Sequence, residues 1–387
     1  MRSIFIAATG QHVGKTTIAL GLLAALRARG VKCQYFKPVG QHFAEHGGRR
    51  ADEDAWLCRA VMGSQVDAEL MSPVTVPEGF VTEYLQHPDC RPLRNKIMEA
   101  QRCLRTEAEM LVVEGTGHAG VGSCLDLSNA TVAAMLDAAV IIVVPGGVGR
   151  SLDEVALSLT LFRNEGVPMA GVVANKVYRE KYDKVSQALR IGLERLGTRL
   201  VGTIPYEPEL AFPTVSQICE ELEAEVLCGK ECLDRIVENT IIAAMTPQNV
   251  LSYLRPGSLV ITPGDRVDNI LLAISADKLD PSGATRSIVG VVLTGGLSPH
   301  PALMPLLENS RLPVLFCRED TYSVSARISQ RVFKINPGDT EKIEAAQRFV
   351  RDYVDIDAIL QAIGEEKRGQ PASGRQKKKS RAPKPRR

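Results

Sequence analysis

The sequence predicts an α/β protein whose first domain is a doubly wound, mainly parallel sheet and whose second, smaller domain is also α/β. Three observations lead to this prediction. Short apolar runs alternate with helical stretches along the 387 residues, and such alternation with short loops is typical of parallel sheets with right-handed crossovers. A strand, a Gly-Lys-Thr loop and a helix follow one another at the N-terminus. A second alternating series begins after Gly229.

The N-terminal stretch is organised around one loop. Ile4–Ala7 is an apolar run typical of a buried strand, and Ile18–Arg29 is a helical run that Gly30 closes. The loop Thr9–Thr17 lies between them. A strand, a loop of this type and a helix form the context that a phosphate-binding loop requires. We therefore expect a nucleotide site here.

Each residue type in this loop has a role in phosphate binding. Gly10 and Gly14 allow backbone N–H groups to point inward at an anion, and the helix N-terminus adds its dipole. Lys15 is expected to neutralise phosphate oxygens, and the Thr16 hydroxyl to bind Mg²⁺. Thr9 replaces the first glycine of the usual phosphate-loop pattern.

Charged residues follow two further strands. Lys37 comes after the strand Val31–Phe36, at the carboxyl end where open α/β sheets collect ligand-binding groups. Glu114 comes directly after an apolar run, as a magnesium-binding carboxylate does in phosphoryl-transfer proteins. Asp52 and Asp54 open a helix; they either cap it or reach a metal beside the phosphates.

Composition is that of a globular protein, with 44% hydrophobic and 24% charged residues. We expect a cytoplasmic protein without membrane insertion, because no signal peptide and no spanning apolar run is found. Nine scattered cysteines argue against a disulfide framework. Cys228 and Cys232 form the only close pair, which is either a metal site or a pair of free thiols.

The last residues are strongly basic. The stretch 365–387 holds ten Lys or Arg against two Glu, so the remainder of the chain carries a net charge of −6. With almost no apolar side chains, residues 364–387 are expected to be a disordered basic tail. Such a tail either binds nucleic acid or an acidic partner or serves only for solubility.

The expected domains are 1–228 for nucleotide binding and 229–363 for the second α/β series. An amphipathic helix over Val215–Leu227 is expected to lead to the boundary at Gly229. In the second series, Gly264-Asp265-Arg266 and Thr294-Gly295-Gly296 follow strands, where they either meet a ligand or form ordinary turns.

The order of these motifs resembles that of the dethiobiotin synthetase family. The resemblance rests on a phosphate loop, a Lys-Pro-Val segment, a Glu-Gly-x-Gly loop and an asparagine after a strand. These are Thr9, Gly10, Val13, Gly14, Lys15, Thr16 and Thr17, then Lys37-Pro38-Val39, then Glu114-Gly115-Thr116-Gly117, and then Asn175.

The resemblance implies a P-loop NTPase-like fold and a Mg-ATP site. Thr16, Asp54 and Glu114 would then be the metal ligands, with Asp54 preferred to Asp52 because Ala55 continues the family's Asp-Ala pattern. Lys15 and Lys37 would contact phosphates and an activated intermediate. Asn175 would recognise the adenine edge, with Pro205 close to the ring. The family also implies a homodimer that pairs through this domain.

The second half resembles a DRTGG domain, and the pairing is similar to the N-terminal region of long-form phosphate acetyltransferases. The chain then ends in the basic tail, so no acetyltransferase domain is expected. Gln41-His42-Phe43 and Thr116-Gly117-His118 depart from the synthetase loops. We therefore expect a nucleotide-dependent regulatory protein with an unknown protein partner and weak turnover. The alternatives are an ATP-dependent ligase that activates a carboxylate or carbamate and, less favoured, a nucleic-acid-associated ATPase.

Overall fold

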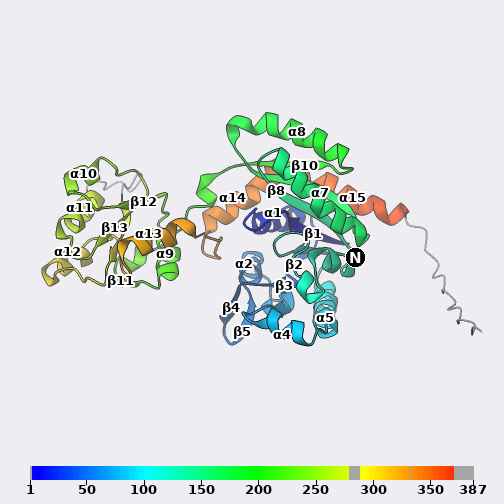
Figure 1. Cartoon of the computed structure of the whole chain (residues 1–387), viewed down its shortest axis with the longest axis horizontal. Helices are drawn as coiled ribbons and strands as arrows, with labels where there is room; N and C mark the ends of the chain where they lie inside the picture. Colours follow the sequence, from blue (N-terminus) through cyan, green and yellow to red (C-terminus); the bar gives the residue numbers. More distant parts are fainter. Residues whose placement is uncertain (1, 279–287, 332, 370–387) are drawn as a thin grey trace, which may run out of the picture. The chain divides into compact units, whose positions relative to one another are not determined.

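A computed structural model describes residues 2–278, 288–331 and 333–369. The chain divides into two compact units (Figure 1). The first unit contains Met1–Tyr206 and a C-terminal stretch that begins at Asn336, and the second unit is Glu207–Ile335. Among the described residues, no helix is both long and apolar enough to cross a membrane.

The first unit is built on a six-stranded parallel sheet with the order β10-β9-β8-β1-β7-β2. Its central strands are almost wholly apolar and buried on both faces, as parallel sheets require. The strands of this sheet are β1 (Arg2–Ala8), β2 (Cys33–Phe36), β7 (Met110–Glu114), β8 (Ala138–Pro145), β9 (Met169–Val177) and β10 (Leu200–Pro205). The doubly wound, parallel fold expected from the sequence is confirmed.

Helices cover both faces of this sheet. The chain moves in one direction from β1 to β2 and in the other from β7 through β10, so right-handed crossovers place α1 on the face opposite to α6, α7 and α8. The helices that connect its strands are α1 (Lys15–Ala28), α2 (Glu53–Met62), α3 (Ala68–Met71), α4 (Phe80–Gln86), α5 (Arg91–Glu107), α6 (Asn129–Met135), α7 (Gly149–Asn164) and α8 (Tyr182–Arg195).

Two C-terminal helices return to the first unit. α14 (Thr340–Tyr353) packs along α1, and α15 (Ile356–Gly369) packs on β9 and β10 (Figure 1). Between them, Val354 forms an antiparallel bridge to Gly202 on the edge strand β10. The sequence analysis had assigned residues up to 363 to the second domain. The chain returns because the buried face of α14 matches the apolar surface that α1 would otherwise expose.

The second unit contains a five-stranded sheet with the order β11-β15-β14-β13-β12. Its strands are parallel except β11, and separate apolar clusters hold α10, α11 and α12 on one side and α9 and α13 on the other. The elements are α9 (Val215–Leu222), β11 (Glu225–Cys228), β12 (Asn239–Ile242), α10 (Pro247–Leu251), β13 (Ser258–Pro263), α11 (Val267–Lys278), β14 (Ile288–Thr294), α12 (Met304–Glu308), β15 (Val314–Phe316) and α13 (Thr321–Gln330). A second, smaller α/β fold is confirmed.

Three local expectations were wrong. The helix that was expected to reach Leu227 ends at Leu222, because Glu223 takes a left-handed φ of 50° and the next residues pair with β15 as β11. Gly229 therefore lies inside the second unit. Residues 364–369, which were expected to belong to the disordered tail, are part of α15; the rest of the expected tail, 370–387, lies outside the described residues.

The polar segment after β2 forms a hairpin. β4 (Phe43–His46) and β5 (Arg49–Asp52) pair antiparallel directly before α2. Two short strands, β3 (Val39–Gly40) and β6 (Val74–Thr75), pair beside them. The hairpin turns at consecutive glycines with positive φ, which suits a tight turn. It leads the chain directly into the acidic start of α2.

Candidate nucleotide and metal site

The phosphate loop joins β1 to α1 at the carboxyl edge of the first sheet. Gly14 is the N-cap of α1 and has a φ of 105°, in a region that side chains other than glycine rarely adopt. A Cβ atom at Gly14 would lie 2.2 Å from Nδ2 of Asn175. Glycine is therefore required here for both conformation and space, and the loop presents the start of α1 as the sequence predicts.

The end of β9 supports this loop. Asn175 donates a hydrogen bond from Nδ2 to the Val13 carbonyl at 2.8 Å, and Lys176 Nζ donates to the His12 carbonyl at 2.9 Å. The Asn175 Oδ1 atom accepts from the Lys176 backbone N–H at 2.9 Å. An amide has a second N–H and a second lone pair. Asn175 thus braces the loop and keeps hydrogen-bonding capacity for a base.

Three oxygen-bearing side chains named as metal ligands converge at the first turn of α1. Thr16 Oγ1 lies 3.0 Å from Glu114 Oε1 and 3.3 Å from Asp54 Oδ1. Glu114 is the last residue of β7, and Asp54 lies in the first turn of α2. Lys15 Nζ points back to the Gly10 carbonyl at 3.4 Å. Residues far apart in sequence are thereby brought to one point.

Lys37 lies among these carboxylates. Its ammonium donates a hydrogen bond to Asp54 Oδ2 and lies 3.3 Å from Asp52 Oδ1 and 3.5 Å from Glu114 Oε1. Lys37, Asp52, Asp54 and Glu114 are each at most 5% exposed. Buried charges of this kind are tolerated only when they are paired and hydrogen-bonded.

Burial and charge act against each other in this cluster. Burial by itself lowers the pKa of the Lys37 ammonium, but attraction by Asp54, Glu114 and Asp52 outweighs it, so the pKa lies well above its usual value. Burial raises the pKa of the Glu114 carboxyl, although Lys37 acts in the opposite direction. Lys37 is therefore held fully protonated.

The donor set suits Mg²⁺. It consists of a hydroxyl and carboxylate oxygens, which are the hard ligands that Mg²⁺ prefers. In the part of the chain that the structure describes, no group of three or more His, Cys, Asp or Glu is arranged as a closed metal cage. Mg²⁺ usually keeps several waters and binds through one or two carboxylates together with substrate phosphates. Thr16, Asp54 and Glu114 fit such an open site.

Comparison with known proteins places this geometry in a family. A family model described as "AAA domain" matches residues 2–214. The chain belongs to this AAA domain family. A second model, "DRTGG domain", matches residues 217–331. We use "AAA domain" for the first unit and "DRTGG domain" for the second from here on.

The similarity to curated relatives extends across nearly the whole chain. The chain is 30% identical to phosphate acetyltransferase of Pseudomonas aeruginosa, covering 94% of this chain and 52% of the relative. It is 26% identical to phosphate acetyltransferase of Nitrosomonas europaea, with the same coverage of 94% and 52%. The chain thus spans about half the length of the curated relatives it matches. The resemblance to the N-terminal region of phosphate acetyltransferases is confirmed.

Among solved structures, the MinC:MinD cell division protein complex of Aquifex aeolicus matches with a TM-score of 0.37 and 16% identity. This match covers 54% of the present chain and 84% of the solved one.

Two residues that contact the lysine–carboxylate cluster were not named as site residues by the sequence analysis. Asp52 was set aside for Asp54, yet it contacts Lys37 and also caps α2 by accepting from the Asp54 backbone N–H at 3.0 Å. Tyr35 was treated only as part of a strand, yet its hydroxyl donates to Glu114 Oε2 at 2.9 Å. Its position on β2, two residues before Lys37, was the available signal.

The loop after Glu114 is held in place from two sides. Asn129 donates to the carbonyls of Thr116 and His118 at 2.7 Å each, and the Thr116 hydroxyl donates to the Val39 carbonyl at 2.6 Å. The last bond ties this loop to the segment after Lys37. The loop that contains Thr116 is therefore joined to Val39, two residues before the other departing segment, Gln41-His42-Phe43.

The remaining expected residues lie apart from the metal ligands. Pro205 is buried at the end of β10, next to the end of β9 that carries Asn175. His118 is exposed, and its Nδ1 accepts from the Gly120 backbone N–H at 3.2 Å. Cys228 and Cys232 do not share a helix, since Cys228 ends β11, so the metal reading of this pair has no support.

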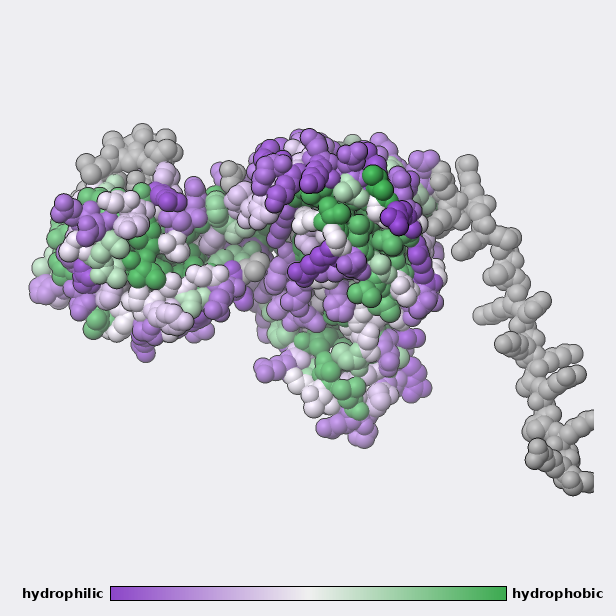
Figure 2. Space-filling view, turned by 45° about the horizontal axis from the view of Figure 1, so that its top comes forward, coloured by the Kyte–Doolittle hydropathy of each residue, from purple (hydrophilic) through white to green (hydrophobic). Residues whose placement is uncertain are grey.

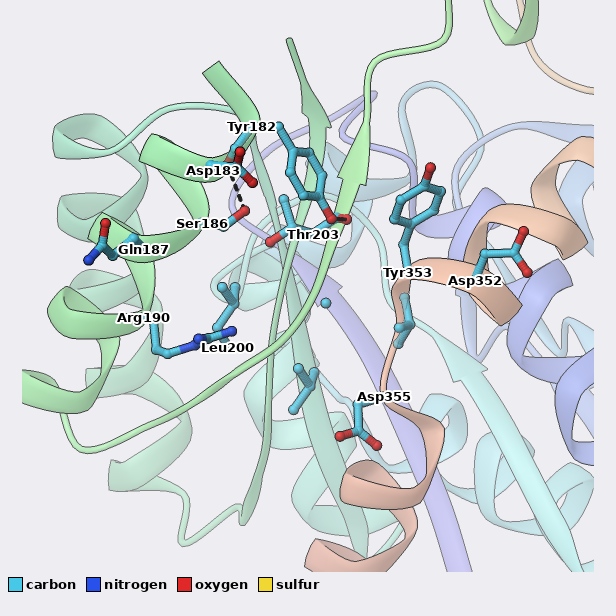
Figure 3. A pocket seen from close by; sticks show the side chains of 13 residues that line it. Tyr182, Asp183, Ser186, Gln187, Arg190, Leu200, Thr203, Asp352, Tyr353 and Asp355 are labelled. Carbon is cyan, nitrogen blue, oxygen red and sulfur yellow. Dashed lines mark hydrogen bonds between the residues drawn. The ribbon is translucent and has the colours of Figure 1, made fainter. Parts of the chain in front are cut away.

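The AAA domain also has a polar hollow of about 780 Å³ between α8, β10 and the junction of α14 with α15 (Figure 3). The rings of Tyr182 and Tyr353 both line it in an edge-to-face arrangement, with centroids 6.2 Å apart. Tyr182 also donates from its hydroxyl to the Thr203 carbonyl at 2.8 Å. None of the residues that the sequence analysis named lines this hollow.

In the DRTGG domain, the two glycine-containing turns lie at the carboxyl ends of adjacent strands. Gly264 donates to the Thr294 carbonyl at 3.2 Å, and Gly295 donates to the Glu319 carbonyl at 2.7 Å. A Cβ atom at Gly264 would lie 1.6 Å from the Leu297 carbonyl oxygen. These contacts support the turn interpretation, because the glycines allow the loops to pack on one another.

Proposed function

We propose that the AAA domain binds Mg-ATP and acts as a nucleotide-dependent regulatory module. The observation that carries the proposal is the convergence of Thr16, Asp54 and Glu114 beside the phosphate loop. Lys15 and the N-terminus of α1 supply positive charge for the phosphates. In this proposal the phosphates are surrounded by the loop residues Thr9, Gly10, Val13, Gly14 and Thr17. The adenine is contacted by Asn175 and Pro205.

Regulation is preferred to dethiobiotin synthesis because of the two segments that depart from the synthetase pattern, Gln41-His42-Phe43 and Thr116-Gly117-His118. A synthetase must hold a long diamine in line with the γ-phosphate, and small errors of position cost orders of magnitude in rate. Here the Thr116 hydroxyl is bonded to the Val39 carbonyl, and the Arg50 guanidinium lies 3.5 Å from the centroid of the Phe43 ring. ATP binding with weak turnover is enough to bias a two-state protein toward one conformation.

The second candidate is an ATP-dependent ligase. One observation favours it, namely that Lys37 lies with the proposed metal ligands, where it can contact a transferred phosphoryl group. Such an enzyme would activate a carboxylate or carbamate as a mixed phosphate anhydride. We also propose that the protein is a cytoplasmic homodimer. Its basic C-terminal residues would bind an acidic protein or a nucleic acid.

Calorimetry with Mg-ATP tests the nucleotide site. Lys15→Ala removes a charge-assisted contact, so the free energy of ATP binding should become less favourable by about 1.5–3 kcal/mol. The matched control is Lys32→Ala, which removes an exposed lysine outside the loop. Equal affinity of Lys15→Ala and wild type would refute the proposed site.

A turnover assay separates the two candidates. Diaminopelargonate, bicarbonate and Mg-ATP are supplied to the full chain, and ADP and dethiobiotin are measured. Little ADP and no dethiobiotin are expected. Turnover on the order of 1 s⁻¹, within the ordinary enzyme range, would favour the ligase instead. Single-turnover ADP release with a panel of amines and carboxylates extends the test to other ligase substrates.

A further inference from the structure

The Lys37 ammonium and the proposed Mg²⁺ require the same two carboxylates, those of Asp54 and Glu114. Glu114 Oε1 lies 3.0 Å from Thr16 Oγ1 and 3.5 Å from Lys37 Nζ. The Asp54 carboxylate is divided between the same two groups, with Oδ1 near Thr16 and Oδ2 bonded to Lys37. In this structure the Lys37 ammonium therefore supplies positive charge to the carboxylates of Asp54 and Glu114.

A metal ion and this ammonium are not compatible in the arrangement described. Two cations a few ångströms apart repel strongly where the side chains are almost wholly buried. The Asp54 carboxylate would have to bind one cation through each oxygen, and Glu114 Oε1 would face both. Binding of Mg²⁺ at Asp54 and Glu114 therefore favours departure of the ammonium from these two carboxylates.

Asp52 provides the position to which the ammonium can move. Its Oδ1 atom lies 3.3 Å from Lys37 Nζ and is oriented by the Asp54 backbone N–H at 3.0 Å. The backbone of Lys37 is fixed by a hydrogen bond from its N–H to the Met71 carbonyl at 2.7 Å. The four-carbon stem of lysine is flexible. The movement is therefore one of the side chain alone.

We propose that Lys37 is a resident counter-ion of the metal site, which Mg²⁺ displaces onto Asp52 and toward the nucleotide phosphates. The inference rests on the proposed Mg-ATP function and specifies how that site is regulated. Bare Mg²⁺ has to compete with Lys37, whereas Mg²⁺ that arrives with a nucleotide brings phosphate oxygens for the released ammonium. Metal and nucleotide therefore bind cooperatively, and the cooperativity is reciprocal.

The test measures Mn²⁺ binding to the full chain without nucleotide, by electron paramagnetic resonance of the free ion. Lys37→Met should bind Mn²⁺ about tenfold more tightly than wild type, or more, because the competing charge is gone. The matched control is Lys342→Met, which removes another buried lysine, paired with Asp339 at 3.5 Å on α14. Equal or weaker Mn²⁺ binding by Lys37→Met would overturn the proposal.

A second measurement, of thermal stability, remains informative if Lys37→Met folds poorly. In this variant Asp52, Asp54 and Glu114 have no lysine to pair with, so millimolar Mg²⁺ should raise its Tm more than it raises the Tm of wild type. An equal or smaller rise contradicts the displacement.

A third measurement uses wild type alone. In NMR with isotope-labelled lysine, the Lys37 ammonium signal, identified by its absence from Lys37→Arg, should shift when Mg-ADP is added. An unchanged signal in protein shown to be loaded would overturn the proposal. If calorimetry instead finds no Mg-nucleotide binding to wild type, the proposed function fails, and the nucleotide-free Mn²⁺ comparison still decides the role of Lys37.

Discussion

Single side chains at the carboxyl edge of the AAA domain sheet make structural contacts beside the roles we propose for them. The Asn175 amide bonds the Val13 carbonyl, and in the proposed function it would also recognise adenine. Asp52 caps α2 and also contacts Lys37. A substitution at such a residue therefore changes the shape of the site as well as its contacts.

Asn175→Ala should weaken binding of both ATP and GTP and also reduce the preference for ATP. The first effect follows from the lost support of the loop at Val13, and the second from the lost donor and acceptor for the adenine edge. Competition binding with both nucleotides measures the two effects separately. An unchanged ATP-over-GTP ratio would show that Asn175 only supports the loop.

Glu114 should make the stability of the protein fall as pH rises. Its pKa in the folded state is raised above the ordinary value of 4.5, mainly by burial. The folded state therefore holds its proton to higher pH than the unfolded state, and stability decreases upward from about pH 4.5. In Glu114→Gln this decrease should be absent. Urea unfolding of wild type and Glu114→Gln at a series of pH values measures this. If the free energy of unfolding depends on pH in the same way in both proteins, Glu114 does not cause the predicted loss of stability.

At the scale of elements, the contact between α1 and α14 depends on one small residue. Gly21 lies in the middle of α1, where glycine normally weakens a helix. A Cβ atom at Gly21 would lie 2.3 Å from the Val350 side chain and 3.0 Å from the Ala346 carbonyl oxygen. The glycine thus lets α14 approach the helix that follows the phosphate loop.

Gly21→Ala should destabilise the protein in spite of its better helix propensity. Overpacking costs roughly 1–3 kcal/mol, and the gain in propensity is about 1 kcal/mol. Adding Val350→Ala should relieve the overlap, so the double variant loses less stability than the sum of the two single variants. Denaturant unfolding of all four proteins measures this. Strict additivity would show that Gly21 is not needed for the helix contact.

At the scale of the whole molecule, the DRTGG domain is inserted in the sequence of the AAA domain, after its last sheet strand and before its last two helices. The chain leaves the first unit after Tyr206 and returns at Asn336. The inserted unit has its own sheet with an apolar cluster on each face.

The surface of the AAA domain has hydrophobic side chains among hydrophilic ones (Figure 2). On α7, Leu157 and Leu161 are exposed one helical turn apart. Exposed apolar side chains of this kind are compatible with the proposed homodimer.

Two fragments should therefore behave differently. Residues 207–335 should fold alone, with a cooperative thermal transition, because both faces of their sheet are covered within the fragment. Residues 1–206 should be poorly soluble, because α1 and β9 lose α14 and α15. Circular dichroism and size-exclusion chromatography check both outcomes. A soluble, cooperatively folding fragment 1–206 would show that the returning helices are dispensable.

Light scattering tests the homodimer at micromolar concentration. Leu157→Glu together with Leu161→Glu should then favour the monomer, because charge would enter an apolar contact. The matched control is Ile191→Glu, an exposed apolar residue on α8 rather than α7. Wild type that is already a monomer would contradict the proposed dimer.

The sequence by itself determined the parallel sheets and the phosphate loop. Apolar runs such as Ile4–Ala7 bury because of their composition, and Gly14-Lys15-Thr16 combines the freedom and charge that a phosphate requires in adjacent residues. Local pattern is enough for such features. It also located Glu114 and Lys37 at strand ends, where chemistry gathers in parallel sheets.

Only the tertiary structure decided which distant residues meet. Nothing local distinguishes a carboxylate that caps a helix from one that contacts a lysine, and Asp52 does both. The return of α14 depends on the match between its apolar face and α1 across more than three hundred residues. Packing of this kind depends on the shapes of two surfaces together, so the pattern of residues in one segment cannot predict it.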